Sequence, residues 1–181
     1  MPVQFWEAPL NAGSPYQTTT GTPLTNSSTA TDISPAPQIT IPANYYYPGQ
    51  LFRLTAWGIY STAATPNLTI GFYYGGAAGP ALCATAATAT GSAVTNLMWY
   101  ATATARITSL GSSGTAVAFG LCTGIGATAA TQVLMPISSA SGNSVTINTT
   151  TANTWTCGAT WGTSSTANTI TCYYYVLELL S

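Results

Sequence analysis

Residues 50–60 read Gln-Leu-Phe-Arg-Leu-Thr-Ala-Trp-Gly-Ile-Tyr, and this stretch is the clearest secondary-structure signal in the chain. Successive side chains of an extended strand point to opposite faces of a sheet. One face of the stretch then carries Leu51, Arg53, Thr55, Trp57 and Ile59. The other face carries Phe52, Leu54, Ala56, Gly58 and Tyr60. Because β-branched and aromatic residues favour the pleated surface of a sheet, the stretch predicts a long β-strand.

Similar runs recur along the chain from residue 38 onward, with turn residues rich in Gly, Ser and Asn between them. These runs are residues 38–41, 68–74, 97–110, 115–122, 144–148, 155–161 and 169–180. About eight short strands with such punctuation are typical of a β-sandwich or barrel. We therefore expect an all-β protein, with a jelly-roll-like antiparallel β-sandwich as its fold.

Two segments bear on the details of this fold. In residues 81–93 threonine alternates with alanine, and β-branched threonine weakens a helix, so we interpret the segment as strand or loop. Residues 57–70 and 161–170 both start with Trp-Gly and pass through a Ser/Thr turn to Thr-Ile. Two related hairpins are compatible with the two halves of a jelly roll, and so is chance similarity in a low-complexity sequence.

The first 37 residues differ in composition from the rest. Residues 11–37 are mostly Thr, Ser, Pro and Gly without hydrophobic periodicity, and proline biases its neighbours to extended conformations. We therefore divide the chain into an extended N-terminal arm, residues 1–37, and a single β-sandwich domain, residues 38–181. Phe5 and Trp6 near the start of the arm are expected to anchor it, either in the domain's own core or on another subunit.

The composition excludes several function classes. Only 3% of the residues are charged, and the chain has no histidine. The sequence also contains no lysine, so histidine-based triads, histidine metal sites, Schiff-base chemistry and a P-loop are all ruled out. Two arginines cannot make the basic patch that drives nucleic-acid binding. We expect no enzyme activity, no cofactor and no nucleic-acid partner.

The sequence also shows no pattern typical of a membrane-spanning segment or of an export signal. Apolar runs are interrupted well short of the ~20 residues that span a bilayer. The first seven residues lack the basic and apolar regions of a signal peptide. We expect no membrane partner, a mature chain that begins at Met1, and synthesis in the cytoplasm.

The four cysteines, Cys83, Cys122, Cys157 and Cys172, show no CxxC spacing. Zinc sites made of sulfur alone usually show such pairs, so a metal site is not expected. Each cysteine is interpreted as a small buried hydrophobic residue. The alternative is a disulfide between Cys157 and Cys172 across a hairpin.

The few charged residues suggest a structural role rather than a catalytic one. A glycosidase needs two carboxylates beside the scissile bond, but Glu7 and Asp32 lie in the arm. Glu178 lies in an apolar strand, where an unpaired charge is costly. We expect it to pair with Arg53 or Arg106, within a subunit or between subunits; the alternative is three separate charges that reach solvent.

Aromatic residues occur in consecutive clusters at 45–47, 72–74, 99–100 and 173–175. Consecutive side chains of a strand point to both faces, so one face needs a neighbour other than open solvent. Contact between subunits explains the clusters most simply; core packing with exposed rims and a glycan site are the alternatives. The residues predicted to lie in interfaces are Phe5, Trp6, Tyr45, Tyr46, Tyr47, Arg53, Arg106 and Glu178.

Three motifs carry a resemblance to a known family: residues 54–62, Leu-Thr-Ala-Trp-Gly-Ile-Tyr-Ser-Thr; residues 71–76, Gly-Phe-Tyr-Tyr-Gly-Gly; and residues 161–172, from Trp-Gly-Thr to Thr-Cys. In these motifs and in composition, residues 50–181 resemble small Thr/Ala/Gly-rich, charge-poor virion structural proteins of tailed phages that infect actinobacteria. The arm is not covered by this resemblance.

The resemblance implies a capsid decoration, or cement, protein that sits on the outer surface of a virion as a homotrimer. We expect it to stabilise the shell by contacts of the N-terminal arm and of aromatic residues. Its expected partners are the major capsid protein and further copies of itself, and the family supplies no catalytic residues. One alternative is a trimeric receptor-binding or fibre-tip module that recognises host glycan. A major coat protein that forms the shell itself is a less suitable alternative for so short a chain.

Overall fold

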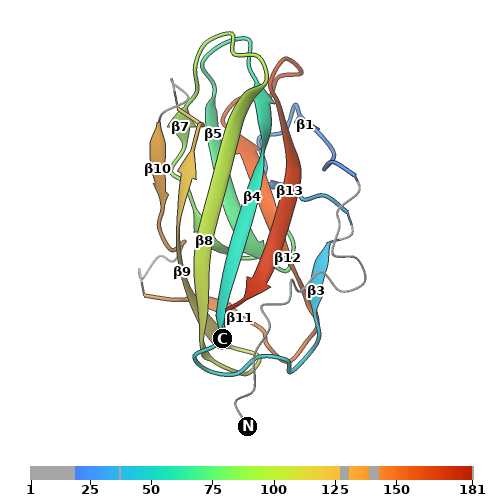
Figure 1. Ribbon diagram of the computed structural model, residues 1–181, viewed down its shortest axis with the longest axis vertical. Coiled ribbons are helices and arrows are strands. Elements are labelled where there is room, and N and C mark those ends of the chain that lie inside the picture. The colour runs from blue at the N-terminus through green and yellow to red at the C-terminus, as the bar shows by residue number, and fades with distance from the viewer. Residues whose placement is uncertain (1–18, 37, 127–130, 139–142, 181) are drawn as a thin grey trace.

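The computed structural model describes residues 19–36, 38–126, 131–138 and 143–180. Within these ranges the chain forms thirteen β-strands and no helix (Figure 1). The strands are β1 (Leu24–Thr25), β2 (Thr31–Asp32), β3 (Ile39–Ile41), β4 (Leu51–Ser61), β5 (Asn67–Tyr74), β6 (Ala81–Ala84), β7 (Thr88–Ala89), β8 (Leu97–Ser109), β9 (Gly114–Thr123), β10 (Gln132–Met135), β11 (Val145–Ile147), β12 (Asn153–Trp161) and β13 (Thr169–Leu179). The prediction of an all-β protein is confirmed.

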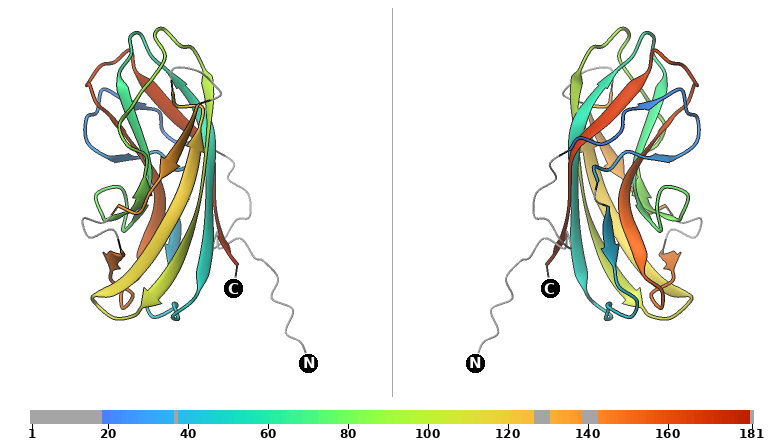
Figure 2. Two further views of the ribbon diagram at one scale, coloured as in Figure 1. Left: turned by 90° about the vertical axis from the view of Figure 1, so that its left-hand side faces the viewer. Right: turned by 90° about the vertical axis from the view of Figure 1, so that its right-hand side faces the viewer.

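The strands form two sheets that pack against each other as the layers of a sandwich (Figure 2). Sheet A has the order β1-β13-β4-β8-β9-β10, and β11 also pairs with β9. Sheet B has the order β2-β12-β5-β6, with β3 beside β12 and β7 beside β5. The paired strands in both sheets are antiparallel. The antiparallel β-sandwich is thus confirmed, while its jelly-roll connection order stays a prediction.

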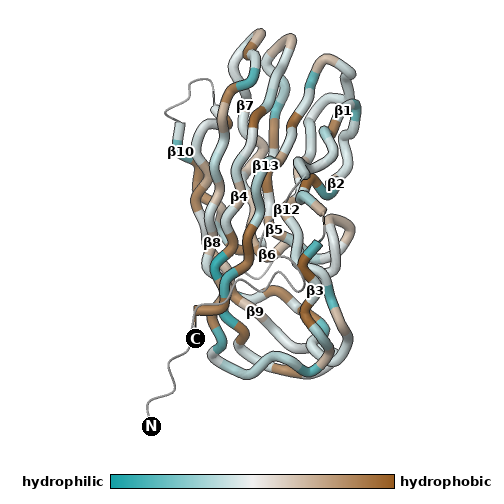
Figure 3. The backbone as a smooth tube through the Cα atoms, turned by 45° about the vertical axis from the view of Figure 1, so that its right-hand side comes forward, coloured by the Kyte–Doolittle hydropathy of each residue, from teal (hydrophilic) through white to brown (hydrophobic). Residues whose placement is uncertain are grey.

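The alternation of residues 50–60 sorts side chains between core and surface as a strand requires. The inner face of β4 buries Phe52, Leu54 and Ala56 completely. The opposite face of the strand leaves Arg53 and Trp57 accessible. Along the backbone, Figure 3 shows hydrophobic residues spread over the strands and few strongly hydrophilic ones, as the low charge content requires.

Aromatic rings hold the two sheets together. Ring centroids lie 5.1–6.5 Å apart in the pairs Phe52–Trp155, Tyr60–Trp161 and Phe72–Tyr175, each of which joins a strand of sheet A to one of sheet B. The inner face of β8 carries the buried alanines Ala101, Ala103 and Ala105. Because protein interiors are close-packed, these small side chains on one sheet leave the volume that the large rings occupy.

Crossing segments tie the sheets together at both sides of the sandwich. On one side, β1 pairs with β13 of sheet A, and the chain then reaches sheet B, where β2 and β3 pair with β12. On the other side, β10 pairs with β9, and Ile137 then forms a bridge with Cys83 of sheet B. Edge strands expose unpaired backbone groups, and these crossings reduce that exposure.

The described part of the predicted arm lies on the chain's own sandwich. Residues 19–36 contribute β1 and β2, and the side chains of Leu24 and Ile33 are buried in the core. The backbone N–H of Ile33 donates a hydrogen bond of 3.0 Å to the carbonyl oxygen of Cys157. Residues 1–18, which include Phe5 and Trp6, lie outside the described residues.

The eight strands predicted from sequence are all present with nearly the same bounds, as β3, β4, β5, β8, β9, β11, β12 and β13. The ambiguous segment 81–93 contains β6 and β7, which agrees with its interpretation as strand or loop. β1, β2 and β10 are not among the predicted strands. They are two to four residues long and lie at sheet edges, too short for a periodic signal.

All four cysteines are buried and free, as the sequence analysis expects. Burial raises the pKa of the thiols of Cys83 and Cys122 to about 12. The pKa of Cys157 is raised well above its usual value by burial, and the neighbouring Cys172 thiol is a further cause. The two cysteines of the alternative disulfide are therefore neighbours in the core, but they are not bonded in this structure.

Candidate interaction surface

The outer face of sheet A presents large apolar side chains from three neighbouring strands to solvent. Trp57 on β4 is 37% exposed, Tyr100 on β8 is 43% exposed, and Tyr174 on β13 is 41% exposed. Met98, two residues before Tyr100 on β8, is 64% exposed. We call Trp57, Met98, Tyr100 and Tyr174 the aromatic patch. Exposed aromatic and methionine side chains of this kind are enriched in protein interfaces.

The strand register brings these residues together. Trp57 lies directly opposite Tyr100 on one side and Tyr174 on the other. The rings of Trp57 and Tyr174 are stacked, with centroids 6.4 Å apart and an interplanar angle of 27°. Tyr173 meets Trp57 edge to face at 5.8 Å. A β-bulge in β13 between Cys172 and Tyr174 adds the extra residue that lets both tyrosines contact Trp57.

Gly58 makes room for this arrangement. A Cβ atom at position 58 would overlap with the carbonyl oxygen of Thr171 and approach the Cα atom of Cys172 to 2.9 Å. The bulged strand therefore passes closer to β4 than any side chain allows. The Trp-Gly dipeptide at 57–58 supplies both the exposed ring and the space for the bulge that holds it.

A hollow lies beside the aromatic patch and is partly formed by it. Its volume is about 530 Å³. Its lining residues are Trp57, Asn96, Leu97, Met98, Trp99, Tyr100, Thr123 and Gly124. The site thus combines two exposed rings with the polar side chains of Asn96 and Thr123.

Toward the other end of the same face, Arg53 and Glu178 form an ion pair. The residues are directly opposite each other on β4 and β13, and Arg53 Nε donates a hydrogen bond of 2.7 Å to Glu178 Oε2. Both side chains retain access to solvent, 42% for Arg53 and 25% for Glu178. Of the two partners predicted for Glu178, the structure selects Arg53, within one subunit.

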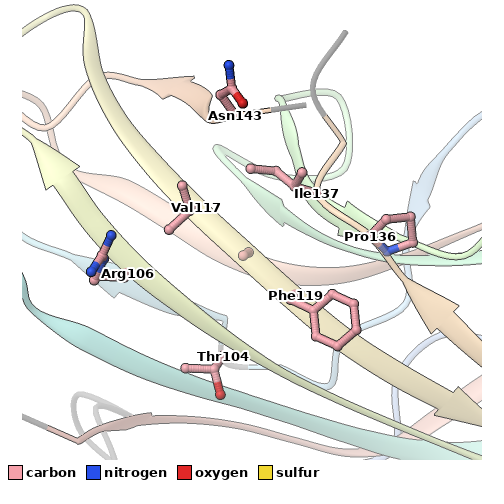
Figure 4. A pocket seen from close by; sticks show the side chains of 8 residues that line it. Thr104, Arg106, Val117, Phe119, Pro136, Ile137 and Asn143 are labelled. Atoms are coloured by element: carbon pink, nitrogen blue, oxygen red, sulfur yellow. The ribbon is translucent and has the colours of Figure 1, made fainter. Parts of the chain in front are cut away.

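Arg106 lies two strands away from Glu178 in sheet A, on β8. Its exposed side chain borders a groove of about 400 Å³ at the edge of the sheet (Figure 4). Val117, Phe119, Pro136 and Ile137 supply most of the apolar wall. Arg106 is thus an accessible cation beside an apolar groove.

The three consecutive tyrosines of the predicted interface have different environments. Tyr46 is 5% exposed, and its hydroxyl accepts a hydrogen bond of 2.7 Å from Trp155 Nε1. Burial is the main cause that raises the pKa of Tyr46. Tyr45 and Tyr47 are 39% and 47% exposed. Tyr46 therefore serves the core, and only its two neighbours remain accessible to a partner.

The described residues contain no group of three or more His, Cys, Asp or Glu side chains placed to hold a metal ion. In the same part of the chain, no helix is long and apolar enough to cross a membrane. No protein-family model matches the chain, and neither does a curated protein or a solved structure.

Trp57, Tyr100 and Tyr174 are missing from the interface residues predicted from sequence. A signal for Trp57 is present, because alternation places it on the same strand face as Arg53 and Thr55. A face that carries an arginine and a threonine is the solvent face, and a tryptophan on it is exposed. No comparable signal separates Tyr174 from its neighbours, because the bulge in β13 interrupts the alternation.

Proposed function

We propose that this chain is a non-enzymatic virion structural protein, a capsid decoration or cement protein that forms a homo-oligomer, with three copies expected. The observation that carries the proposal is the aromatic patch, an exposed apolar cluster that the strand register brings together on the middle strands of sheet A. The resemblance of residues 50–181 to small phage virion proteins supports the same function. The proposed location is the outer capsid surface, with synthesis in the host cytoplasm.

In the proposed mechanism the protein stabilises a shell by contact alone. Its partners are the major capsid protein and further copies of itself, without nucleic acid, membrane or cofactor. The aromatic patch buries apolar area against a neighbour, and burial of apolar area is the main favourable term in association. The formal net charge of −1 provides little long-range electrostatic attraction. Attachment should therefore change little between low and high salt, and steep weakening with salt would contradict this mechanism.

The copy number of the chain in purified particles tests the proposal. Quantitative mass spectrometry against the major capsid protein should give hundreds of copies per particle. Absence from particles would overturn the virion function. A few dozen copies or fewer would instead favour an adhesin at a fibre or vertex.

Variants of the patch test the observation itself. Tyr100→Ser and Tyr174→Ser should each reduce the number of attached copies, because they remove exposed apolar area from the centre of the proposed contact. Leu110→Ser is the matched control, since Leu110 is also exposed, at 46%, but lies beyond the end of β8. Equal attachment of all three variants would contradict a role for the patch.

The hollow beside the patch favours one second candidate, a receptor-binding or fibre-tip module that recognises host glycan. Sugar rings stack on aromatic faces, and their hydroxyl groups need polar neighbours such as Asn96 and Thr123. A glycan array probed with the purified protein tests it. Binding that Tyr100→Ser abolishes and Leu110→Ser preserves would support this candidate over decoration.

A further inference from the structure

The outer edge of β9 has a gap in its hydrogen-bonded ladder. β11 pairs with residues 114–116 of this strand, and β10 pairs with residues 120–123. Residues 117–119 between them pair with β8 on one side but with no described strand on the other. At this gap the chain leaves sheet A after β10 and crosses to sheet B, where Ile137 forms a bridge with Cys83.

The groove beside Arg106 lies at this gap. Its wall contains Val117, Ala118 and Phe119 of β9, with Pro136 and Ile137 on the opposite side (Figure 4). Phe119 is 58% exposed, although it belongs to a long strand. A short edge segment with an apolar groove is a site where an extended peptide can add itself as a strand.

The charges of the chain point to one peptide. Arg53 and Glu178 form a pair, and Asp32 accepts hydrogen bonds from the backbone N–H of Ser34 and the side chain of Gln38. Arg106 is exposed and has no carboxylate partner within the described ranges. The one further side-chain carboxylate in the sequence is Glu7, which directly follows Phe5 and Trp6. The segment therefore combines the aromatic residues that an apolar groove accepts with the charge that Arg106 lacks.

The strand register makes this match specific. If residues 5–7 pair antiparallel with the gap, Phe5 lies opposite Phe119 and Glu7 opposite Val117. Val117 is in turn the cross-strand partner of Arg106, so Glu7 and Arg106 occupy one row of the outer face and can meet over the small valine. Trp6 then lies opposite Ala118, a small residue that lines the groove. A parallel arrangement would place Glu7 beside Phe119 instead.

We infer that residues 5–7 of one copy of this chain dock as an added strand on residues 117–119 of a second copy. The described chain begins beside β13, where the N–H of Gly21 donates to the carbonyl oxygen of Cys172, and the groove lies at the opposite edge of sheet A. Two copies placed edge to edge bring these features together. Residues 8–18 can span at most ~40 Å. In this arrangement they need to cross only the boundary between the two copies, whereas docking on their own chain would require them to cross the whole face of sheet A. Such a head-to-tail contact gives a closed ring when the rotation between successive copies closes and an open filament when it does not, and the homo-oligomer of the proposed function corresponds to the ring.

The inference rests on the proposed function only for the formation of a homo-oligomer, and it is tested on the purified full-length chain. Glu7→Arg and Arg106→Glu each place like charges in the contact, and each should weaken self-association about tenfold in Kd. An equimolar mixture of the two variants should restore association in part, because the segment of one variant then meets a groove of opposite charge on the other. In a ring of three copies, two of the three contacts are of this kind. Sedimentation velocity over a concentration series measures this, with Gln132→Glu on β10 as the control for an added charge outside the groove.

Three results would overturn the inference. The first is a wild-type chain that stays monomeric at ~100 µM, a concentration at which contacts of even modest affinity are populated. The second is unchanged association of both single variants. The third is rescue in the double variant but not in the mixture, which would mean that the segment docks on its own chain. Presence of the protein on particles is measured separately, so failure of this contact leaves the decoration function testable, and the reverse also holds.

Discussion

Arg53 and Glu178 are cross-strand neighbours on β4 and β13, and their side chains are joined by a hydrogen bond of 2.7 Å on the outer face of sheet A. The pair lies on the same face as the aromatic patch, a few residues along the same two strands. A partner that covers the patch would also reduce the access of water to this pair. Exclusion of water strengthens the attraction between the two charges but also removes their hydration, so the net effect of assembly on the pair depends on both terms.

Replacement of Glu178 by Gln should lower the free energy of unfolding of the isolated chain by about 0.2–1 kcal/mol. The value is small because both side chains remain accessible to solvent, which screens the attraction. Urea unfolding of Glu178→Gln, Arg53→Gln and the double variant gives the coupling free energy of the pair. Arg106→Gln is the control, and it should leave stability unchanged. A coupling of zero, with normal self-association of the Glu178 and Arg53 variants, would show that the pair serves neither folding nor assembly.

Replacement of Tyr46 by Phe should cost about 1–3 kcal/mol of stability. The Tyr46 hydroxyl is the acceptor for Trp155 Nε1 at 2.7 Å, and without it a buried N–H loses its partner. The ring itself stays in contact with Phe52, so the loss reports the hydrogen bond rather than packing.

Tyr47→Phe is the matched control for that measurement, because Tyr47 is 47% exposed in the same loop. Its free energy of unfolding should stay within about 0.5 kcal/mol of the wild type. If both variants lose the same free energy, the assignment of Tyr46 to the core is incorrect.

The long strands could be predicted from the sequence because alternation has a period of two, and eleven residues such as 51–61 repeat it several times. β1 and β2 contain two residues each, so no period exists to detect. Their positions follow from the backbone hydrogen bonds that the sheet edges offer. The burial of Tyr46 could not be predicted from the sequence either. Tyr46 lies between strands, where the direction of side chains follows no repeat.

The partner of Glu178 could not be chosen from the sequence either. Arg53 and Arg106 both lie in strands, and the choice depends on which strand is the neighbour of β13. Sheet A has the order β13-β4-β8, so Arg53 is adjacent and Arg106 is one strand farther away. Strand order arises from the packing of the whole sandwich and leaves no local pattern.

The free energy of unfolding should fall in alkaline solution, and the ionisation of the buried thiols sets the pH range of this fall. The pKa of Cys83 and Cys122 is raised to about 12 in the folded protein, whereas a thiol in an unfolded chain has a pKa of ~8.5. Between these values the unfolded chain releases protons that the folded chain keeps, so ionisation favours unfolding. The contribution of the two thiols to the free energy of unfolding is complete below about pH 8.5. It is lost as pH rises toward 12, by up to ~1.4 kcal/mol per pH unit for each thiol. Urea unfolding from pH 7 to 10.5 measures the slope.

The same burial predicts slow thiol chemistry. At pH 8 an aromatic disulfide reagent should leave all four cysteines of the folded protein unmodified and react with all four in guanidinium chloride. Fast reaction of one cysteine in the folded state would contradict its burial. Fewer than four reactive thiols in the unfolded state would reveal a disulfide, with Cys157 and Cys172 as the neighbouring pair.

Replacement of Gly58 by Ala should destabilise the protein and disturb the aromatic patch at the same time. The new Cβ atom would overlap with the backbone carbonyl of Thr171, and backbone atoms can move only if the bulge in β13 opens. We expect a loss of about 2–4 kcal/mol, together with a weaker near-ultraviolet circular dichroism signal from the stack of Trp57 and Tyr174. Thr55→Ala, on the outer face of the same strand, is the control and should preserve the signal. If Gly58→Ala unfolds at the wild-type urea concentration with an intact signal, then the bulge does not depend on this glycine, and the exposed position of Trp57 needs another physical explanation.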